Sequence, residues 1–530
     1  MDSHSIIGEN AITLFWMLMA VAVVALLTKR IRVPYTVALV VAGLGIAVIP
    51  GAPNVELTPD LILAVFLPTL IFEAAYNLHF AHLREVLRTV SLLAVPGVLL
   101  TGGLVATAMY FLAGLPWPGA LLFGAIVAAT DPVSVVATFK ELGAPARLRT
   151  LLEGESLFND GTALVVFRLL LGVAAAGTFN FGASLGQFAL VISGGLGLGL
   201  VGGFIASRLI RQFEDYLVET VLTVVLAYGT YFLAESLHVS GVIAVVVAGL
   251  VVGNYGQRVS FSPTSLIAVG LSWEFFGFLA NSLIFLFVGL QVQHGRLFDY
   301  AGPLAVAIGA VVLARAVSVG VVAGVVRLLH IDQPLPWRWQ VLLVWGGLRG
   351  SLSLAMALAL PYSLGGPQSG LREELLVLTF GVILFTLLIQ GLTLKPLLAR
   401  LGLITADPAH ASYQELHARL RAIRAAQAVL EQQVIEGRLA ARSTQELREG
   451  YARREAALQE ELETRHGQDA AFYAAEVRAG QHALLTVERT TLRALVTEGA
   501  LPEEGWKRAA ADIDHQLADL AAGGGGDPHV

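Results

Sequence analysis

Apolar runs of about 20 residues recur along this chain between Ala11 and Arg400. As an α-helix, a run of that length crosses the hydrocarbon core of a bilayer, and no soluble fold needs so many of them. Of the 530 residues, 56% are hydrophobic and only 14% are charged. The sequence therefore predicts an all-α polytopic membrane protein. Because cysteine is absent, disulfides and thiolate metal sites are excluded.

We predict about thirteen membrane-spanning helices. Their approximate ranges are 11–27, 35–50, 59–78, 89–113, 118–138, 151–175, 183–208, 216–237, 239–254, 266–290, 302–328, 339–361 and 373–399. Lys and Arg are biased to alternate loops: fifteen share the side of the loop that follows the first span, and only Arg296 and Arg372 lie on the other side. Basic loops stay in the cytoplasm, so the N-terminus is expected outside and the C-terminal tail in the cytoplasm.

A change in composition near Leu403 divides the chain. Residues 1–400 carry 20 basic and 20 acidic side chains, whereas residues 401–530 carry 14 and 20, so the net charge of −6 lies in the second part. We predict a transmembrane domain over residues 1–404 and a helical cytoplasmic tail over residues 405–530. Apolar tail residues at alternating spacings of four and three fit either a solvated helical bundle or a dimerising coiled coil. These residues are Leu416, Leu420, Ile423, Leu430 and Val434.

The sixth predicted span contains an acidic motif, Glu155-Ser156-Leu157-Phe158-Asn159-Asp160-Gly161, within an apolar stretch. A charged residue at the centre of a membrane helix costs roughly 2.5–3.5 kcal/mol on insertion scales, so such residues mainly pair, line an ion path or move protons. Residues four apart share a helix face. Ser156 and Asp160 therefore share one face, and Glu155 and Asn159 share the next. This separation suggests one face that binds a ligand and one that braces the fold.

Two spans are predicted to be interrupted. The fifth contains Ala129-Thr130-Asp131-Pro132, where proline removes a backbone donor and crowds the preceding turn. The twelfth contains Trp345-Gly346-Gly347-Leu348-Arg349-Gly350-Ser351, where three glycines weaken the helix. The two spans are seven apart and so run in opposite directions, which is typical of inverted-repeat transporters with a midplane site. Counted along their spans, Asp131, Asp160 and Arg349 all lie near the middle of the bilayer.

These motifs resemble those of the monovalent cation:proton antiporter family, specifically its electroneutral sodium/proton exchanger branch. The matching elements are Thr130-Asp131-Pro132, Glu155-Ser156 with Phe158-Asn159-Asp160-Gly161, Gly346-Gly347-Leu348-Arg349-Gly350, and Phe66-Leu67-Pro68 leading into Phe72-Glu73. The resemblance covers about residues 10–400. The electrogenic branch has Asp-Asp in place of Asn159-Asp160. The resemblance therefore implies one-for-one exchange of Na⁺ for H⁺, with Li⁺ as a further candidate substrate.

The resemblance also implies the ion-binding residues. Asp160 would be the titrating carboxylate that holds either Na⁺ or a proton. Asp131, Ser156 and the backbone carbonyl of Thr130 would complete the Na⁺ shell, with Glu73 contributing directly or through water. Structural alternatives stay open: Asp131 as a cap on the positive ends of half-helices, Glu73 as a hydrogen-bonded spacer, and Asp160 as a permanent partner of a buried arginine.

The same resemblance implies structural roles for the neighbouring residues. Glu155 would pair with Arg349, and Asn159 would brace the interrupted fifth span. Arg315 also lies deep in its span and needs a partner. We expect a transporter rather than an enzyme, with no cofactor beyond the transported Na⁺ and H⁺. We further expect a multi-pass homodimer in the cell membrane that serves pH homeostasis and binds no nucleic acid.

Two rival functions remain open. A K⁺/H⁺ antiporter could use the same scaffold, because selectivity depends on the size of the ion shell and on the cost of dehydration. A gated cation channel is a rival from another class, although the apolar flanks of the acidic motif argue against a continuous polar lining.

Overall fold

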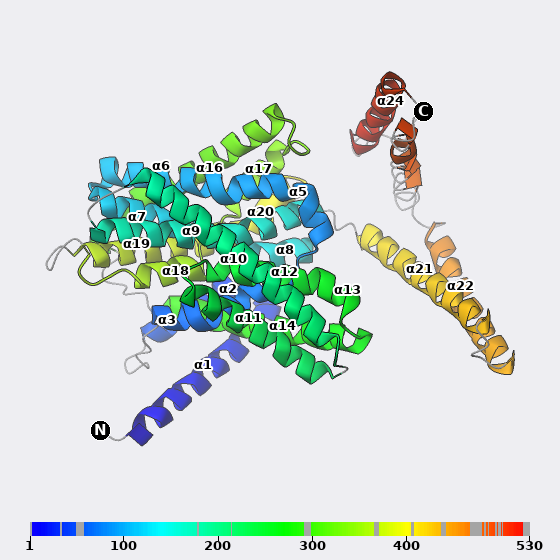
Figure 1. The fold of residues 1–530 in the computed structure, drawn as a ribbon, viewed down its shortest axis with the longest axis horizontal. Helices are drawn as coiled ribbons and strands as arrows, with labels where there is room; N and C mark the ends of the chain where they lie inside the picture. The colour runs from blue at the N-terminus through cyan, green and yellow to red at the C-terminus, as the bar shows by residue number, and fades with distance from the viewer. Residues whose placement is uncertain are drawn as a thin grey trace. The chain divides into compact units, whose positions relative to one another are not determined.

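The computed structural model describes residues 3–31, 34–48, 58–176, 180–213, 215–290, 298–364, 370–403, 408–435, 441–466 and, with short interruptions, 477–522. The chain divides into two compact units, Met1–Ile404 and Thr405–Val530. Helices and their connections make up the described ranges, which contain no β-strand (Figure 1). The predicted all-α class is confirmed.

Most of the first unit consists of helices. Up to the first interrupted span they are α1 Ser3–Ile31, α2 Tyr35–Ala47, α3 Pro59–Leu61, α4 Leu67–Asn77, α5 Phe80–Leu92, α6 Val98–Ala113, α7 Trp117–Ala128 and α8 Val133–Leu142. Then follow α9 Ala146–Ala176, α10 Phe181–Ile210, α11 Tyr216–Ser236, α12 Gly241–Val251, α13 Gln257–Val259, α14 Pro263–Leu290, α16 Ala301–Leu328, α17 Trp337–Trp345, α18 Ser351–Leu358, α19 Leu371–Phe385 and α20 Gly391–Arg400.

Short π-helical turns join some of these helices into longer rods. They are η1 Ile62–Phe66, η2 Leu93–Gly97, η3 Val252–Gly256 and η4 Thr386–Gln390. The turn η2 contains Pro96, which explains the irregularity there, because proline cannot donate its backbone hydrogen bond. The rods continue through these turns, in contrast to the two interrupted spans described below.

Each of the thirteen predicted ranges falls on a helix, on such a rod, or on an interrupted pair of helices. Within the described ranges, nine helices are long and apolar enough to cross a membrane. Three shorter apolar helices accompany them, at Phe15–Thr28, Tyr35–Ala47 and Gly241–Gly256. The interrupted pair α17–α18 accounts for the remaining range. The multi-pass helical fold is confirmed, whereas the number of membrane crossings stays a prediction.

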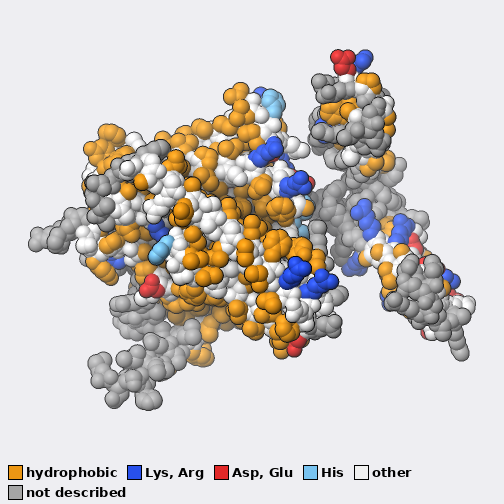
Figure 2. Space-filling view, in the orientation of Figure 1, with side chains coloured by type: hydrophobic (Ala, Val, Ile, Leu, Met, Phe, Trp, Pro, Cys, Tyr) orange, Lys and Arg blue, Asp and Glu red, His pale blue; other side chains and the backbone are white. Residues whose placement is uncertain are grey.

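The surface of the first unit is apolar over most of the face seen in Figure 2, with basic side chains gathered at its right edge. The helix α10 is the clearest case, since only 17% of its most apolar 18-residue stretch is buried. Leu185, Leu190 and Val201 on this helix are each more than half exposed. Apolar surface of this extent marks a region that faces lipid or another protein.

In the second unit, α21 Pro408–Ile435 and α22 Ala441–His466 form an antiparallel hairpin, and α24 spans Glu503–Ala522. Leu416 and Leu420 of α21 are buried against Leu462 of α22. Arg448 donates two hydrogen bonds to the carboxylate of Glu431, at 2.7 and 2.5 Å, and these bonds hold the pKa of Glu431 below its usual value. Part of the heptad-like face of α21 is therefore covered within one chain, as in a helical bundle.

Two glycines allow α2 and α14 to pack closely. A Cβ atom at Gly43 would collide with the backbone of Leu286 and Gly289, and one at Gly289 would collide with the backbone of Val40 and Gly43. Small residues permit this approach of helix backbones in membrane proteins. The contact fixes α14, which forms one wall of the site described below.

Gly43→Ala is expected to lower the thermal unfolding temperature of the purified protein. The added methyl group would meet backbone atoms that cannot rotate away, and overpacking of this kind costs about 1–3 kcal/mol. Gly45→Ala is the matched control, because its Cβ position on the same helix has no heavy atom within 4 Å. Equal unfolding temperatures for the two variants would show that the helices are not in close contact at Gly43.

Candidate functional site

The two interrupted spans meet at their breaks. Residues 129–132 separate α7 from α8, and residues 346–350 separate α17 from α18. The backbone N–H of Asp131 donates to the carbonyl of Leu348 at 2.8 Å, so the two non-helical segments are hydrogen-bonded to each other. The predicted crossing of two broken helices is confirmed. Non-helical backbone at membrane depth persists only where it is buried or lines a cavity.

Arginine side chains bind the carbonyl ends of two half-helices at this crossing. Nε of Arg349 donates to the carbonyl of Val127 in the last turn of α7 at 2.8 Å. Nε and Nη2 of Arg315 donate to the carbonyl of Leu343 in the last turn of α17, at 3.2 and 3.1 Å. The carbonyl end of a helix carries partial negative charge, so both arginines lie where a cation is stabilised.

Asp131 binds the opposite ends of the other two half-helices. Its carboxylate accepts a hydrogen bond from the N–H of Val133, at the start of α8, at 3.0 Å. It also accepts one from the N–H of Ser351, at the start of α18. The first turn of a helix carries partial positive charge and unpaired N–H groups. Asp131 therefore has the capping geometry considered from the sequence, and it lines the cavity described next as well.

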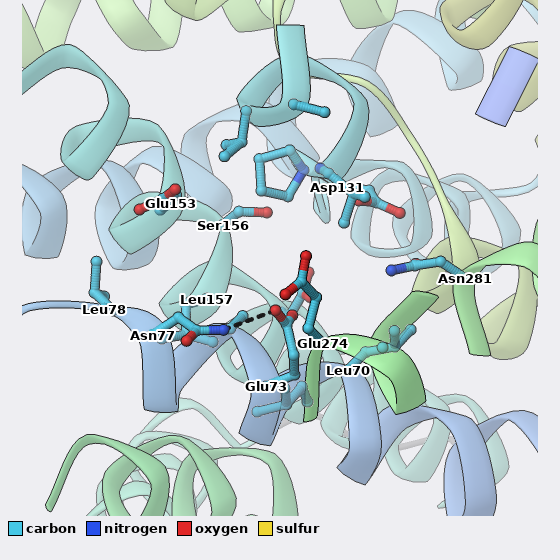
Figure 3. A pocket seen from close by; sticks show the side chains of 18 of the residues that line it. Leu70, Glu73, Asn77, Leu78, Asp131, Glu153, Ser156, Leu157, Glu274 and Asn281 are labelled. Carbon is cyan, nitrogen blue, oxygen red and sulfur yellow. Dashed lines mark hydrogen bonds between the residues drawn. The ribbon is translucent and has the colours of Figure 1, made fainter. Parts of the chain in front are cut away.

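A cavity of about 870 Å³ opens beside the crossing (Figure 3). Five residues predicted to bind an ion line it: Glu73, Thr130, Asp131, Ser156 and Asp160. They come from α4, from the break between α7 and α8, and from α9. The fold thus gathers around one space residues that lie far apart in the sequence. That they bind a cation stays a prediction.

The two faces of α9 have different surroundings. Ser156 and Asp160 line the cavity, and the hydroxyl of Ser156 donates to the carbonyl of Thr130. Asn159 is buried, donates from Nδ2 to the hydroxyl of Thr130 at 2.6 Å, and accepts from the N–H of Thr130 at 3.3 Å. The side chains of α9 therefore hold the non-helical segment at Thr130 in place.

The buried ion pair at this crossing joins Glu155 to Arg315, and the predicted pair of Glu155 with Arg349 is wrong. Nη1 and Nη2 of Arg315 donate to the two carboxylate oxygens of Glu155 at 2.5 and 2.8 Å. The two side chains are 5% and 1% exposed. Arg349 instead donates to the backbone carbonyls of Val127 and Gly347. Both arginines lie deep in their spans, and depth alone does not tell which one faces α9.

Asp160 faces the cavity, and within the described ranges its carboxylate has no hydrogen-bond or ion-pair partner. Neither Arg315 nor Arg349 pairs with it: Arg315 binds Glu155, and Arg349 binds the carbonyls of Val127 and Gly347, although its Nη2 has no partner among the described residues. Glu73 differs, since its Oε1 accepts a hydrogen bond from Asn77 at 2.8 Å. An ionised carboxylate away from bulk water is costly unless a cation or a proton compensates it.

Sequence reasoning missed the wall of the cavity formed by α14. Glu274 and Asn281 of this helix line the cavity, as do Gly270 and Gly277. Their spacing of four, three and four places all of them on one helix face. The signal was present in the sequence as a periodic row of small and polar residues in an apolar span. Glu153 of α9 also lines the cavity without having been predicted.

Glu155→Gln and Arg315→Leu are each expected to lower the free energy of unfolding by about 3–5 kcal/mol, because each leaves a buried charge without its partner. The double variant should recover part of this loss, as measured by thermal or denaturant unfolding in detergent. Arg349→Leu combined with Glu155→Gln is the comparison and should show weaker coupling. Strictly additive losses for Glu155 and Arg315 would contradict the pairing.

Comparisons with known proteins agree with this architecture. Residues 17–400 match the family described as "Sodium/hydrogen exchanger, transmembrane". The Na⁺/H⁺ antiporter ApNhaP of Aphanothece halophytica is 44% identical over 394 residues, which cover 74% of each chain. The low-affinity Na⁺/H⁺ antiporter NhaS1 of Synechocystis sp. is 42% identical over 416 residues, which cover 77% of this chain and 78% of the relative.

A solved structure shares the fold. The sodium proton antiporter MjNhaP1 of Methanocaldococcus jannaschii at pH 8 superposes with a TM-score of 0.61 at 23% identity, covering 74% of this chain and 99% of that chain. The family match extends over most of the chain and includes both interrupted spans and the acidic motif on α9. The chain therefore belongs to the transmembrane sodium/hydrogen exchanger family.

Proposed function

We propose that this protein is a secondary antiporter that exchanges Na⁺ for H⁺, one for one, by competition of the two ions at Asp160. The observation that carries the proposal is the carboxylate of Asp160, which has no partner among the described residues and faces the same cavity as Asp131, Ser156 and Thr130. The names of the relatives as Na⁺/H⁺ antiporters support the choice of ions. Li⁺ is included as a second substrate because it offers the same charge to the same oxygen ligands.

Competition at one carboxylate couples the two ions. Protonated Asp160 is neutral, whereas deprotonated Asp160 needs a cation to offset the cost of a charge away from water. Carboxylate, hydroxyl and carbonyl oxygens suit a hard cation such as Na⁺. A site with neither ion is costly to move across the membrane, so leak is suppressed. Because a single carboxylate changes its occupant, the net charge moved in each cycle is close to zero.

The hydrogen bonds of the crossing indicate which parts move together. Asn159 and Ser156 tie α9 to the segment at Thr130, and Glu155 ties α9 to Arg315 of α16. These elements form one body that carries the site. The wall made by α2, α4, α11 and α14 is a second group of helices, in which α14 contacts each of the other three. Alternating access then moves the crossing body against this wall.

The bias of basic loops supports the membrane orientation. Lys140 and Arg149 line the cavity, and both belong to a loop assigned to the cytoplasm. The cavity therefore opens to the cytoplasm in this conformation, with the N-terminus outside and the tail inside the cell. The exposed apolar face of α10 supports a homodimer in the cell membrane, since a second copy would cover it.

Asp160→Asn is expected to abolish Na⁺-driven proton flux while the protein still folds and inserts, because the group shared by the two ions is lost. The measurement uses purified protein in vesicles with the membrane potential clamped, and Asp299→Asn, an exposed residue that does not line the cavity, is the control. In the wild type, the apparent KM for Na⁺ should rise as the pH falls, because protons compete for Asp160. Persistent flux in Asp160→Asn would refute the assignment, and parallel assays with Li⁺ and K⁺ decide the cation.

Removal of residues 405–530 is expected to leave a protein that inserts and still exchanges ions. Each residue proposed to bind an ion lies before Leu403, and the described residues that line the cavity all belong to the first unit. The deletion is expected to change the rate, the pH at which exchange begins, or the dimeric fraction, measured in the same vesicles and by light scattering. Complete loss of exchange in a folded, inserted variant would show that the tail completes the transport path.

A further inference from the structure

The α14 wall of the cavity contains a row of small and polar residues beside the apolar residues Leu266, Ile267, Leu271 and Phe278. Gly270, Glu274, Gly277 and Asn281 all line the cavity, on one face of the helix. At the two glycines no side chain of α14 projects into the cavity. The Cβ position of Gly270 has no heavy atom within 4 Å, and the side chain of Glu73 lies across Gly277. Asn281 is the member nearest the C-terminal end of α14, and Figure 3 shows its amide turned into the cavity below Asp131.

The amide of Asn281 is incompletely satisfied. Its Oδ1 atom is buried and has no hydrogen-bond partner among the described residues. A buried polar atom without a partner is uncommon in folded proteins, and where one occurs, a bound ion or water can complete its hydrogen bonding. A half-turn of the amide about its terminal bond exchanges the positions of its oxygen and nitrogen. Figure 3 shows the amide nitrogen facing the cavity, and this half-turn would bring the oxygen to the same place without any movement of α14.

The position of Asn281 is fixed by the packing of its helix. The hydroxyl of the next residue, Ser282, is hydrogen-bonded to the hydroxyl of Tyr35 on α2 at 2.9 Å. Farther along, Gly289 lies against the backbone of Gly43. The ligands proposed above at Thr130, Asp131, Ser156 and Asp160 all belong to the crossing and to α9. Asn281 adds a neutral polar group from the facing wall, where Glu73 of α4 also lines the cavity, and this packing holds its backbone position.

We propose that Asn281 is a specificity-determining residue whose amide oxygen binds the cation, directly or through one water, in the conformation with the cavity open. This inference rests on the proposed function. A neutral oxygen leaves the number of exchanged protons unchanged. A ligand at a fixed position nevertheless discriminates among Li⁺, Na⁺ and K⁺, because discrimination between cations depends on cavity size, ligand number and the rigidity of the site.

The test compares Asn281→Ala and Asn281→Asp with the wild type in vesicles that are given Na⁺, Li⁺ or K⁺. For Asn281→Ala we expect the apparent KM for Na⁺ to rise roughly 2- to 10-fold, as for the loss of one hydrogen-bond-strength contact, with the maximal rate retained. The ratios among the three KM values should change. Asn281→Asp keeps the shape and the oxygen but adds negative charge. It should lower the KM and raise the pH of half-maximal exchange, because the competing proton is held more tightly.

Ser272→Ala is the matched control on the same helix, since its hydroxyl donates to the carbonyl of Ala268 and it does not line the cavity. Thermal unfolding with and without Na⁺ separates binding from folding, because a bound ligand stabilises the folded state. Asn281→Ala should lose part of the Na⁺-induced stabilisation, whereas Ser272→Ala should keep it. Should Asn281→Ala fail to fold, the nearly isosteric Asn281→Asp decides the question alone.

The outcomes separate this inference from the function on which it rests. One outcome is that exchange is lost in Asp160→Asn while the Asn281 variants keep the wild-type ratios of the three KM values. That result would overturn only the role of Asn281. A variant that is less stable but equally selective would do the same, by showing that the residue is structural. Absence of cation-driven proton flux in the wild type would overturn the proposed function and this inference with it.

Discussion

The crossing of two broken helices depends on compensation of the partial charges at its four half-helix ends. Two carbonyl ends and two N–H ends meet in a region shielded from water, where uncompensated dipoles and charges are costly. Arg349 and Arg315 bind the carbonyl ends, and Asp131 binds the N–H ends. Glu155 then neutralises Arg315 through two hydrogen bonds. Without these side chains, the non-helical segments would lack a stable position.

This compensation also explains why Asp160 is available to an ion. Among the described residues, the buried arginines Arg315 and Arg349 bind Glu155 and helix-end carbonyls rather than Asp160. Asp160 therefore faces the cavity without a permanent counter-charge, within reach of a mobile cation or a proton. The structural charges and the exchangeable charge lie on adjacent faces of the same helix, α9. A step of one residue along α9 thus separates a residue that stabilises the fold from one that we propose to transport ions.

The cavity lies between two bodies held together in different ways. On one side, side-chain hydrogen bonds from α9 and buried ion pairing hold the crossing. On the other side, backbone contact at Gly43 and Gly289 holds α14 against α2. The carboxylate of Asp160 belongs to the crossing side and the neutral amide of Asn281 to the α14 side, so we expect the two groups to affect transport differently. We propose that the carboxylate of Asp160 determines how many protons are exchanged and that the amide of Asn281 adjusts which cation is preferred.

The sequence by itself determined the all-helical membrane fold, both interruptions, and the residues around the cavity from α4, the first break and α9. These follow from local rules: the length of apolar runs, the effect of Pro132 and of the glycines near Arg349, and the high cost of carboxylates in a membrane. Tertiary structure alone decided that Glu155 pairs with Arg315. Two arginines at similar depth are equivalent along a one-dimensional chain, and only the packing of α16 and α9 distinguishes them. The same holds for Asn281, whose importance depends on which face of α14 meets the crossing.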